Sequence, residues 1–242
     1  MDICAEYLPT PRLRPFVECI WHSEAAIDTG FEIIPDGCVD ACFVLSERNP
    51  RILLFGTTTR TSVYELEPGA PYFGVRFRPG KAPFFIQARI SDLTNAQMNV
   101  PDFLGLSPGE ILEAVSFADR RTRLESALMI ALSNGVDATM GSLSHAISVI
   151  DSRHGDVRVR DLARSCNLSE RQLERLFLDR VGITPKLYSR IRRFRSVLNH
   201  LEDPVSQEPP KLADVAASYG YTDQSHLVRD FHDFSHSLSI ST

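Results

Sequence analysis

Long hydrophobic runs and a secretion signal are both missing from this sequence. No apolar stretch among its 242 residues reaches the roughly 18 residues that span a membrane. The N-terminal stretch MDICAEYLPTPRLRPF carries acids and prolines where a secretion signal has a basic start and an apolar core. Hydrophobic content of 43% and charged content of 24% are typical of a globular protein in water. We therefore expect a cytoplasmic protein that does not contact a membrane.

Cysteine pairs with metal-ligand spacing are also missing. The cysteines, five in number, include no CxxC pair, and the sequence has no HxH motif. An odd number of cysteines in a reducing compartment favours free thiols over a disulfide framework. No serine, cysteine or histidine stands in a pattern that would pair a nucleophile with a base. The sequence thus predicts no catalytic residue, no metal and no cofactor, and a protein that is not an enzyme.

The stretch FEIIPDGCVD, residues 31–40, contains the best remaining candidate for a metal or thiol site. Cys38 and Cys42 are four residues apart, so on one strand they would share a face about 13 Å apart at ~3.3 Å per residue. That distance is too long for one metal ion. The Pro-Asp-Gly that precedes Cys38 is typical of a turn. We interpret the segment as a turn between strands followed by buried thiols, and a metal or redox site is the alternative.

The chain divides into a β-rich part and a helical part. In residues 1–105, short segments rich in β-branched and aromatic residues alternate with Gly, Pro and Asn, which is typical of a sandwich or barrel. Apolar residues then recur at helical spacing over Pro108–Leu132. We assign residues 106–140 to a helical connector, which is also a candidate dimerisation element, and residues 141–242 to an all-helical domain. Glycines that flank small polar residues predict a linker at 133–141.

The helical part contains two copies of one motif. Residues 162–177, LARSCNLSERQLERLF, align with residues 215–231, VAASYGYTDQSHLVRDF, after one inserted residue in the turn. Each copy predicts a short helix, a tight turn and a second helix whose buried side carries a Leu and a Phe. The helix between the copies, Thr184–Leu201, spans roughly 27 Å at 1.5 Å per residue. It could hold two recognition helices about one DNA turn, ~34 Å, apart.

These motifs carry a resemblance to a known family. Residues 143–242 resemble the DNA-binding domain of the AraC/XylS family of transcription regulators, through LARSCNLSERQLERLFLDRVGITPKLYSRIRRFRSVL and LADVAASYGYTDQSHLVRDF. The resemblance implies an α+β fold with an N-terminal β-rich cupin-like barrel, a connecting helix, and a C-terminal all-α domain in which a long helix joins two helix-turn-helix motifs. The stretch HDFSHSLSIST departs from the family at its end, so we expect the last helix of the family to be shortened or absent.

The outward faces of the two second helices hold the candidate base contacts. On residues 169–180 this face carries arginine and glutamate, and arginine suits the acceptor pair of guanine while glutamate can accept from cytosine. On residues 222–234 it carries glutamine, which suits adenine. By the resemblance, the positions for base contacts are Arg171, Glu174, Arg175, Gln224, Ser225, His226 and Arg229. Each could instead be a solvated helix residue, and Glu174 could pair with a neighbouring arginine along the helix.

Phosphate contacts are expected from the helix caps and from an arginine cluster. Such contacts position a protein on DNA without reading its sequence. The candidates are Ser169, Arg190, Arg192, Arg193 and Thr222. The net charge of −5 does not oppose DNA binding, because the surface that meets DNA matters rather than the sum. Double-stranded DNA is the expected partner, together with RNA polymerase and, in a homodimer, a second copy of the chain.

The resemblance further implies that the β-rich part binds a small-molecule effector, whose identity the sequence does not give. The stretches IIPDGCVDACFVL, FGTTTRT and GVRFRPGKAPFF resemble an N-terminal domain of some family members. The candidates for lining an effector pocket are Trp21, Phe31, Phe43, Tyr72 and Arg76. Aromatic residues in a barrel are more often core than pocket, so these residues could equally be core.

Two other functions stay open. The β-rich part could be a metal- or thiol-based sensor or a cupin-type enzyme that carries a DNA-binding tail. The helical part could be a protein-interaction module that no longer binds DNA. In the leading interpretation, effector binding shifts the arrangement or the spacing of the two DNA-binding units.

Overall fold

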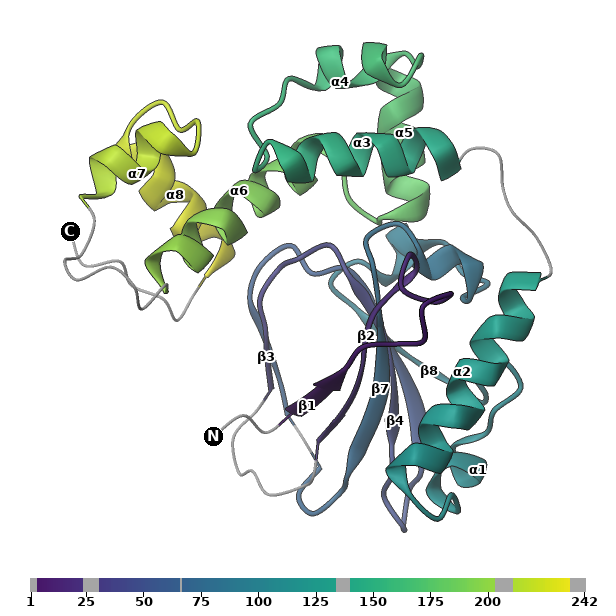
Figure 1. Ribbon diagram of the computed structural model, residues 1–242. Helices are drawn as coiled ribbons and strands as arrows, with labels where there is room; N and C mark the ends of the chain where they lie inside the picture. The colour runs from purple at the N-terminus through teal and green to yellow at the C-terminus, as the bar shows by residue number, and fades with distance from the viewer. Residues whose placement is uncertain (1–3, 24–30, 66, 134–139, 203–210, 236–242) are drawn as a thin grey trace.

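The structure is a computed structural model. It describes residues 4–23, 31–65, 67–133, 140–202 and 211–235. Strands and two helices form a sheet half (described residues up to 133), and the later helices form a helical half that lies over one end of the strands (Figure 1). The mixed α+β class is confirmed. Most of the predicted linker, and residues 236–242 of the atypical C-terminal stretch 232–242, lie outside the described residues. None of the described helices is long and apolar enough to cross a membrane.

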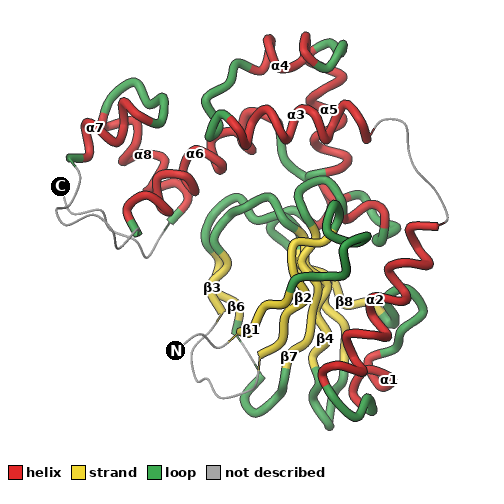
Figure 2. Tube along the Cα trace, in the orientation of Figure 1, coloured by secondary structure: helices red, strands yellow, loops and turns green. Residues whose placement is uncertain are grey.

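The strands form two antiparallel sheets (Figure 2). The strands are β1 Cys4–Tyr7, β2 Val17–Ser23, β3 Phe31–Ile33, β4 Val39–Val44, β5 Arg51–Phe55, β6 Ser62–Tyr64, β7 Tyr72–Phe77 and β8 Gln97–Val100. The larger sheet has the order β1-β2-β7-β4-β5-β8, and β3 pairs with β6 in the smaller one. The predicted cupin-like barrel is not confirmed. The larger sheet is open, because within the described residues no ladder joins its edge strands β1 and β8 or connects it to the β3–β6 pair.

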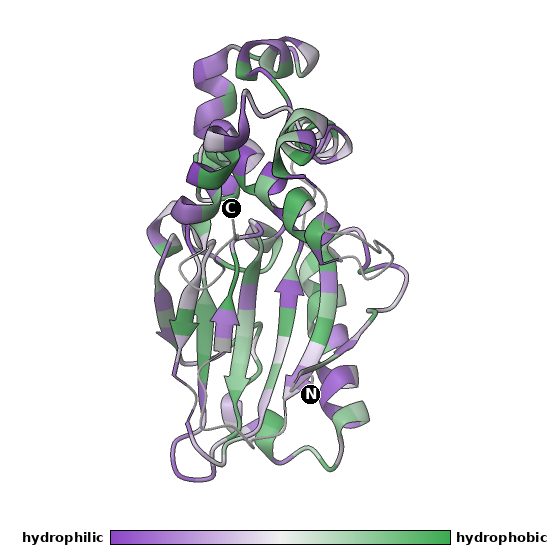
Figure 3. Ribbon diagram, turned by 90° about the vertical axis from the view of Figure 1, so that its left-hand side faces the viewer, coloured by the Kyte–Doolittle hydropathy of each residue, from purple (hydrophilic) through white to green (hydrophobic). Residues whose placement is uncertain are grey.

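One face of the larger sheet is covered by α1 (Pro108–Leu112) and α2 (Phe117–Ser133). Side chains alternate between the two faces of a strand, and Ala41 and Phe43 of β4 both point into the core under the helices. Leu124 and Leu128 of α2 are fully buried against them. The strands are correspondingly rich in hydrophobic residues (Figure 3). The candidate dimerisation helix α2 therefore has a packing partner within its own chain.

The helix predicted over Pro108–Leu132 is in fact two helices. Ser107 begins α1 with a capping box. Ser116 begins α2, because its hydroxyl oxygen accepts a hydrogen bond from the backbone N–H of Asp119 at 3.2 Å. Val115 lies between the helices and is 95% exposed, although the apolar spacing had placed it on a buried face. The serine cap outweighs the periodicity that the surrounding leucines suggest.

The Pro-Asp-Gly-Cys stretch is a turn between β3 and β4, as the sequence indicated. Cys38 N donates to Asp36 Oδ1 at 2.8 Å. Gly37 has a φ of +84°, a left-handed conformation that favours glycine. A Cβ at Gly37 would lie 2.6 Å from Cε2 of Tyr188, a fully buried residue of the helical half. The turn therefore links the two sheets and also packs against the helical half.

The helical half is built around one hydrophobic core. Its helices are α3 Met140–Ser152, α4 Val159–Ser165, α5 Glu170–Arg180, α6 Pro185–Leu201, α7 Leu212–Ser218 and α8 Gln224–Phe234. The long helix α6 begins as predicted, with Thr184 as its cap and Pro185 in the first turn. Ile191 and Phe194 are fully buried along one side of α6. The core therefore runs along α6 from the pair α4–α5 to the pair α7–α8.

Candidate nucleic-acid interface

Helices α4 and α5 form the first helix-turn-helix unit. The turn between them contains Asn167 with a φ of +56°, and Leu168 N donates to Ala163 O at 2.9 Å. Ser169 then caps α5 in a capping box. Its hydroxyl accepts from Gln172 N at 3.3 Å, and Gln172 Oε1 accepts from Ser169 N at 2.9 Å. Together these bonds fix the direction in which α5 leaves the turn.

Helices α7 and α8 form the second unit with the same turn geometry. Gly220 has a φ of +70°, and Tyr221 N donates to Ala216 O at 2.9 Å, the same length as the matching bond in the first unit. Asp223 caps α8, since its Oδ1 accepts from the N–H of His226 at 2.8 Å. This cap comes one residue later than the serine cap of the first unit, as the inserted residue in the alignment predicted.

The inner side of each second helix is buried. Leu173 and Phe177 of α5 have no exposed surface, and Leu227 and Phe231 of α8 are 0% and 3% exposed. These are the leucine–phenylalanine pairs that the aligned motifs placed on the buried side. With their backs fixed in the core, α5 and α8 each turn one face to solvent.

The predicted base contacts lie on these outward faces. The exposed ones are Arg171, Glu174, Arg175, Ser225 and Arg229, and the half-buried ones are Gln224 and His226. The His226 ring meets the Tyr221 ring edge-on at 5.1 Å, which holds it close to the turn. Arg229 Nε donates to Ser225 O at 3.2 Å, one helical turn back. Exposed guanidinium groups on these faces can reach base edges, and their contact with DNA stays a prediction.

Arg190, a predicted phosphate contact, joins α6 to α8. Its guanidinium lies 2.7 Å from Asp230 and 2.6 Å from Asp233. It also stands 5.0 Å from the centre of the Phe234 ring. The Asp230 side chain is only 1% exposed, so removing this arginine would leave a buried carboxylate without its ion-pair partner. The geometry gives Arg190 a structural role within the second unit.

The other two arginines of the cluster are also engaged inside the helical half. Arg192 Nε forms an ion pair with Asp151 at 2.8 Å. Burial raises the pKa of the Asp151 carboxyl, while Arg192 acts in the opposite direction. Arg193 donates to Gly155 O at 3.0 Å and lies over the Tyr221 ring at 5.1 Å. A phosphate would have to compete with these partners, so phosphate contact by this cluster stays a prediction.

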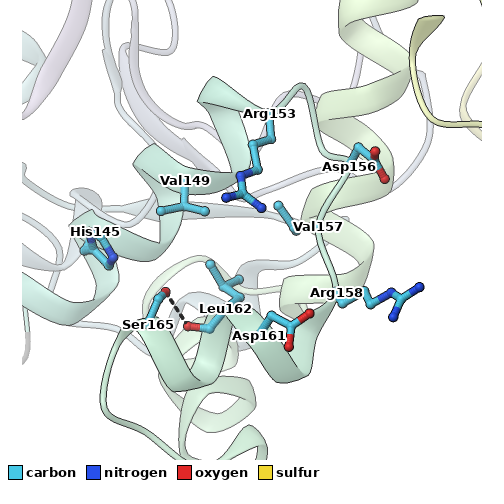
Figure 4. Close-up of a pocket in the computed structure, with 9 residues that line it drawn as sticks. All are labelled: His145, Val149, Arg153, Asp156, Val157, Arg158, Asp161, Leu162 and Ser165. Carbon is cyan, nitrogen blue, oxygen red and sulfur yellow. Dashed lines mark hydrogen bonds between the residues drawn. The ribbon is translucent and has the colours of Figure 1, made fainter.

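Sequence reasoning did not single out a group of exposed arginines next to the first unit. Arg153 and Arg158 line a groove of about 600 Å³ between α3 and α4, together with His145 and Asp161 (Figure 4). In this view Arg158 points away from the groove toward solvent. Arg160, at the start of α4, is exposed as well. The signal in the sequence was the alternation VRVRD, residues 157–161, which spans the start of α4.

Four of the five predicted effector residues lie on the larger sheet, on opposite faces of it. Phe43 lies in the core under α2 and is 0% exposed. Trp21, Tyr72 and Arg76 share the other face. Tyr72 and Arg76 each lie two residues from Gly74 on β7, and Trp21 on β2 pairs with Gly74 and packs against it. For Phe31 only the backbone, in β3, is described. The structure therefore brings three of the five residues to one face and separates Phe43 from them.

Two carboxylates hold Arg76 on this face. Arg76 Nε lies 3.2 Å from Asp40 Oδ1, and its terminal nitrogen lies 3.7 Å from Asp36. Trp21 Nε1 donates to Asp40 at 3.1 Å. Burial raises the pKa of the Asp40 carboxyl and raises that of the Cys38 thiol well above its ordinary value. A reactive cysteine needs a lowered pKa, which is the opposite of the shift at Cys38. Separately, in the described ranges no three His, Cys, Asp or Glu residues are grouped to hold a metal ion.

Two units with one turn geometry, buried leucine–phenylalanine backs and arginine-bearing outward faces define a helix-turn-helix DNA-binding protein. Residues 162–238 match a family model described as a helix-turn-helix domain, of the AraC type. The helical half therefore contains an AraC-type helix-turn-helix domain. Residues 5–99 match a model described as a domain of unknown function. No curated protein shows significant similarity to the chain.

Several solved structures are similar to this one. A transcriptional regulator from Chromobacterium violaceum, described among AraC-type DNA-binding domain-containing proteins, has 22% identity and a TM-score of 0.35 and covers 39% of this chain and 81% of its own. ToxT from Vibrio cholerae strain SCE256 with an unsaturated fatty acid bound has 12% identity and a TM-score of 0.41, covering 88% of both chains. ToxT from Vibrio cholerae O395, bound to a naphthalenyl butenoic acid, has 10% identity and a TM-score of 0.45, covering 89% and 94%.

Proposed function

We propose that the chain is an AraC-type transcription regulator, and that it reads two blocks of double-stranded DNA, one with α5 and one with α8, under the control of a small molecule bound by the sheet half. The observation that carries the proposal is the repeated unit, with its equal turn bonds of 2.9 Å and its buried helix backs. In a helix-turn-helix the second helix enters the major groove. Two such helices on one connecting helix can enter successive grooves on the same side of the duplex.

The reading residues are those on the outward faces. Arg175 and Arg229 occupy matching positions in the two units and are both exposed, which suits bidentate contact with guanine. The remaining contacts to base edges are assigned to Arg171, Glu174, Gln224, Ser225 and His226. Phosphate contacts are assigned to Ser169 and Thr222 at the starts of the reading helices. The cluster Arg190, Arg192 and Arg193 supports the fold first, through the ion pairs described above.

The experiment that tests DNA reading selects bound fragments from the source genome with the purified protein, and repeats the selection with Arg175→Ala and Arg229→Ala. Each variant should lose about 1–3 kcal/mol of binding free energy and relax specificity in its own block. Arg48→Ala, an exposed arginine of the sheet half, is the matched control and should select the wild-type motif. If neither variant changes the motif, the assignment of the reading residues is wrong. If the wild type enriches no motif at low salt, DNA reading itself is wrong.

The effector is placed on the sheet face that carries Trp21, Tyr72 and Arg76. This face offers aromatic rings beside one guanidinium, which suits a ligand with an apolar body and an anionic group that replaces Asp36 or Asp40. Trp21 is the single tryptophan of the chain, so its fluorescence reports on this face directly. A small carboxylic acid that changes the fluorescence of the wild type but not of Arg76→Ala supports the placement. A response that survives Arg76→Ala removes it.

RNA polymerase and a second copy of the chain are the further partners we propose for a regulator of this type. Ile130 on α2, 66% accessible, is one of the exposed apolar residues that a second copy could contact. The metal-sensor alternative predicts stoichiometric zinc or iron in the purified protein, which elemental analysis measures. The interaction-module alternative predicts a wild-type protein that enriches no DNA motif under any salt condition.

A further inference from the structure

One loop of the sheet half touches the ends of both proposed reading helices. This loop, Gly56–Thr61, connects β5 to β6. Thr57 Oγ1 donates to Val181 O, at the C-terminal cap of α5, at 2.6 Å. Thr61 donates twice to Phe234 O, the last residue of α8, from its backbone N at 2.8 Å and from its hydroxyl at 2.7 Å. Carbonyl groups at a helix C-terminus lack partners within the helix, so the loop supplies the partner in both units.

The loop has little freedom to move. A Cβ at Gly56 would lie 1.9 Å from Leu93 O, which means that the loop starts in direct backbone contact with the neighbouring segment. Asn95 N donates to Thr57 O at 3.0 Å, and the Asn95 side chain accepts from Thr59 N at 2.8 Å. Thr57 and Thr61 are almost fully buried. While these contacts hold, the loop is a fixed support for the two helix ends.

The short loop limits how far apart those ends can be. Thr57 and Thr61 are four positions apart, and an extended chain spans at most ~3.6 Å per residue, so the two carbonyls lie within about 25 Å of each other. While both sets of bonds exist, the separation of the C-terminal ends of α5 and α8 is set by the sheet half. Without the bond to Phe234, the second unit is positioned by its contacts within the helical half, with α6 and with His154 before α4.

The first unit has additional contacts with the sheet half. Thr94 Oγ1 donates to Gly182 O at 2.7 Å, directly after α5. Arg89 lies 3.9 Å from Asp179, and Lys81 Nζ donates to a serine of α3 at 2.6 Å. The first unit is thus docked at several points, and the loop positions the second unit relative to it.

We propose that Thr57 and Thr61 are positioning residues that set the distance between the two reading helices, and thereby the length of DNA between the two blocks that the protein accepts. This inference rests on the proposed DNA reading and adds the element that regulates it. The loop leaves the sheet at Phe55, whose ring lies 4.9 Å from that of Tyr64 where the loop returns. Phe55 packs against the same cluster as Trp21. A ligand on that face that displaces Phe55 or Tyr64 moves the loop and changes the preferred spacing.

The test uses a DNA library in which the two selected blocks are separated by spacers of varied length. The full-length wild type should enrich one spacer. Thr57→Val and Thr61→Val remove the hydroxyl donor and keep the side-chain shape. They should bind the preferred spacer about 2- to 12-fold more weakly, the range for one buried hydrogen bond, and should accept neighbouring spacers while selecting unchanged block sequences. Thr59→Val is the matched control, because in the described contacts its hydroxyl meets Asn95 of its own half, and it should keep the wild-type spacer.

A spacer preference that is unchanged in both variants overturns the proposal, even if overall affinity falls. Hydrogen exchange provides a second readout that needs no DNA. The backbone N–H of Thr61 donates to Phe234 O, and its protection should fall in Thr57→Val and Thr61→Val but not in Thr59→Val. If the wild type selects no DNA at all, the proposed function fails. The exchange result then decides separately whether the loop holds the second unit, and equal protection in all variants overturns that role.

Discussion

The two helix-turn-helix units share a local design and differ in what supports them. The turn bonds are equal, each second helix has a side-chain cap, and each buries a leucine and a phenylalanine. The first unit rests on the sheet half through Thr57, Thr94 and Arg89. The second unit contacts α6 through Arg190, the segment between α3 and α4 through the Tyr219 and His154 rings, and the sheet half through Thr61 of the loop. A motif that determines local geometry therefore leaves its stability and placement to its neighbours.

The largest effect is expected from truncating the buried leucine of each unit. Leu227→Ala and Leu173→Ala should each lower the free energy of unfolding by about 2–5 kcal/mol, the cost of a large-to-small change in a core. Hydrogen exchange measured by segment should show that Leu227→Ala exposes α7 and α8 alone. Leu173→Ala should expose α4 and α5 and also loosen the segment around Thr94 that rests on them. Equal loss of protection across both units, in both variants, would contradict the difference in support.

Removing the ion pair of the second unit should have the next largest effect. Arg190→Ala leaves the Asp230 carboxylate, 1% exposed, without its cation, which should cost about 3 kcal/mol. Thermal unfolding and the salt dependence of DNA binding measure the two possible roles separately. A structural arginine lowers the melting temperature of the second unit and leaves the salt slope unchanged. A lost phosphate contact lowers the slope by about one and leaves the melting temperature alone.

Docking of the first unit can be weakened at Gly182. Gly182 has a φ of +89°, and a Cβ there would lie 2.7 Å from Thr94 Oγ1. Gly182→Ala should lower stability by about 2 kcal/mol, of which about 1 is backbone strain. Gly69→Ala is the matched control, because Gly69 has a φ of +81° with nothing within 4 Å of its Cβ position. The control should lose only the stability that backbone strain costs. Equal melting temperatures for the two variants would mean that the close approach to Thr94 causes no further loss of stability.

The smallest effect is expected at the caps. Ser169→Ala and Asp223→Ala should each cost about 1 kcal/mol, because each leaves a backbone N–H of the first helical turn without its side-chain partner. Ser169→Asp and Asp223→Ser keep a capping oxygen and should cost little. Urea unfolding gives the difference between the alanine and exchange variants. A loss in the exchange variants as large as in the alanine variants would show that the caps act by something other than this hydrogen bond.

Local patterns predicted most of the helical half. Period and capping residues gave α5 with its cap, α6 with Pro185 in its first turn, and α8 with its buried Leu227. These features depend on residues three or four positions apart, which a sequence displays directly. The same reasoning placed the predicted reading residues on outward faces, although it did not show that His226 is half-buried against its own turn.

Features that depend on distant residues could not be predicted. The carboxylate partner of Arg190, Asp230, lies 40 positions further along the chain. The sequence therefore showed a basic cluster but not the acidic residues that pair with it. The open sheet follows from which strands pair, and strand periodicity does not specify pairing between segments far apart. Phe43 and Tyr72 were grouped because both are aromatic, whereas their positions on adjacent strands put them on opposite faces. The threonine loop carried no recognisable motif, since its role lies in contacts 124 and 173 residues away.

Two side chains of the sheet half, Ile34 and Phe84, pack into the hydrophobic core of the helical half. Tyr188 of α6 is buried where the Gly37 turn covers it. The helical half is consequently unsuited to exchange between proteins. Transferring it alone onto another domain would expose apolar surface and promote aggregation. A folded chimera would have to include the PDGC turn and the segment around Phe84 together with the helices. The smallest transferable unit therefore contains parts of both halves.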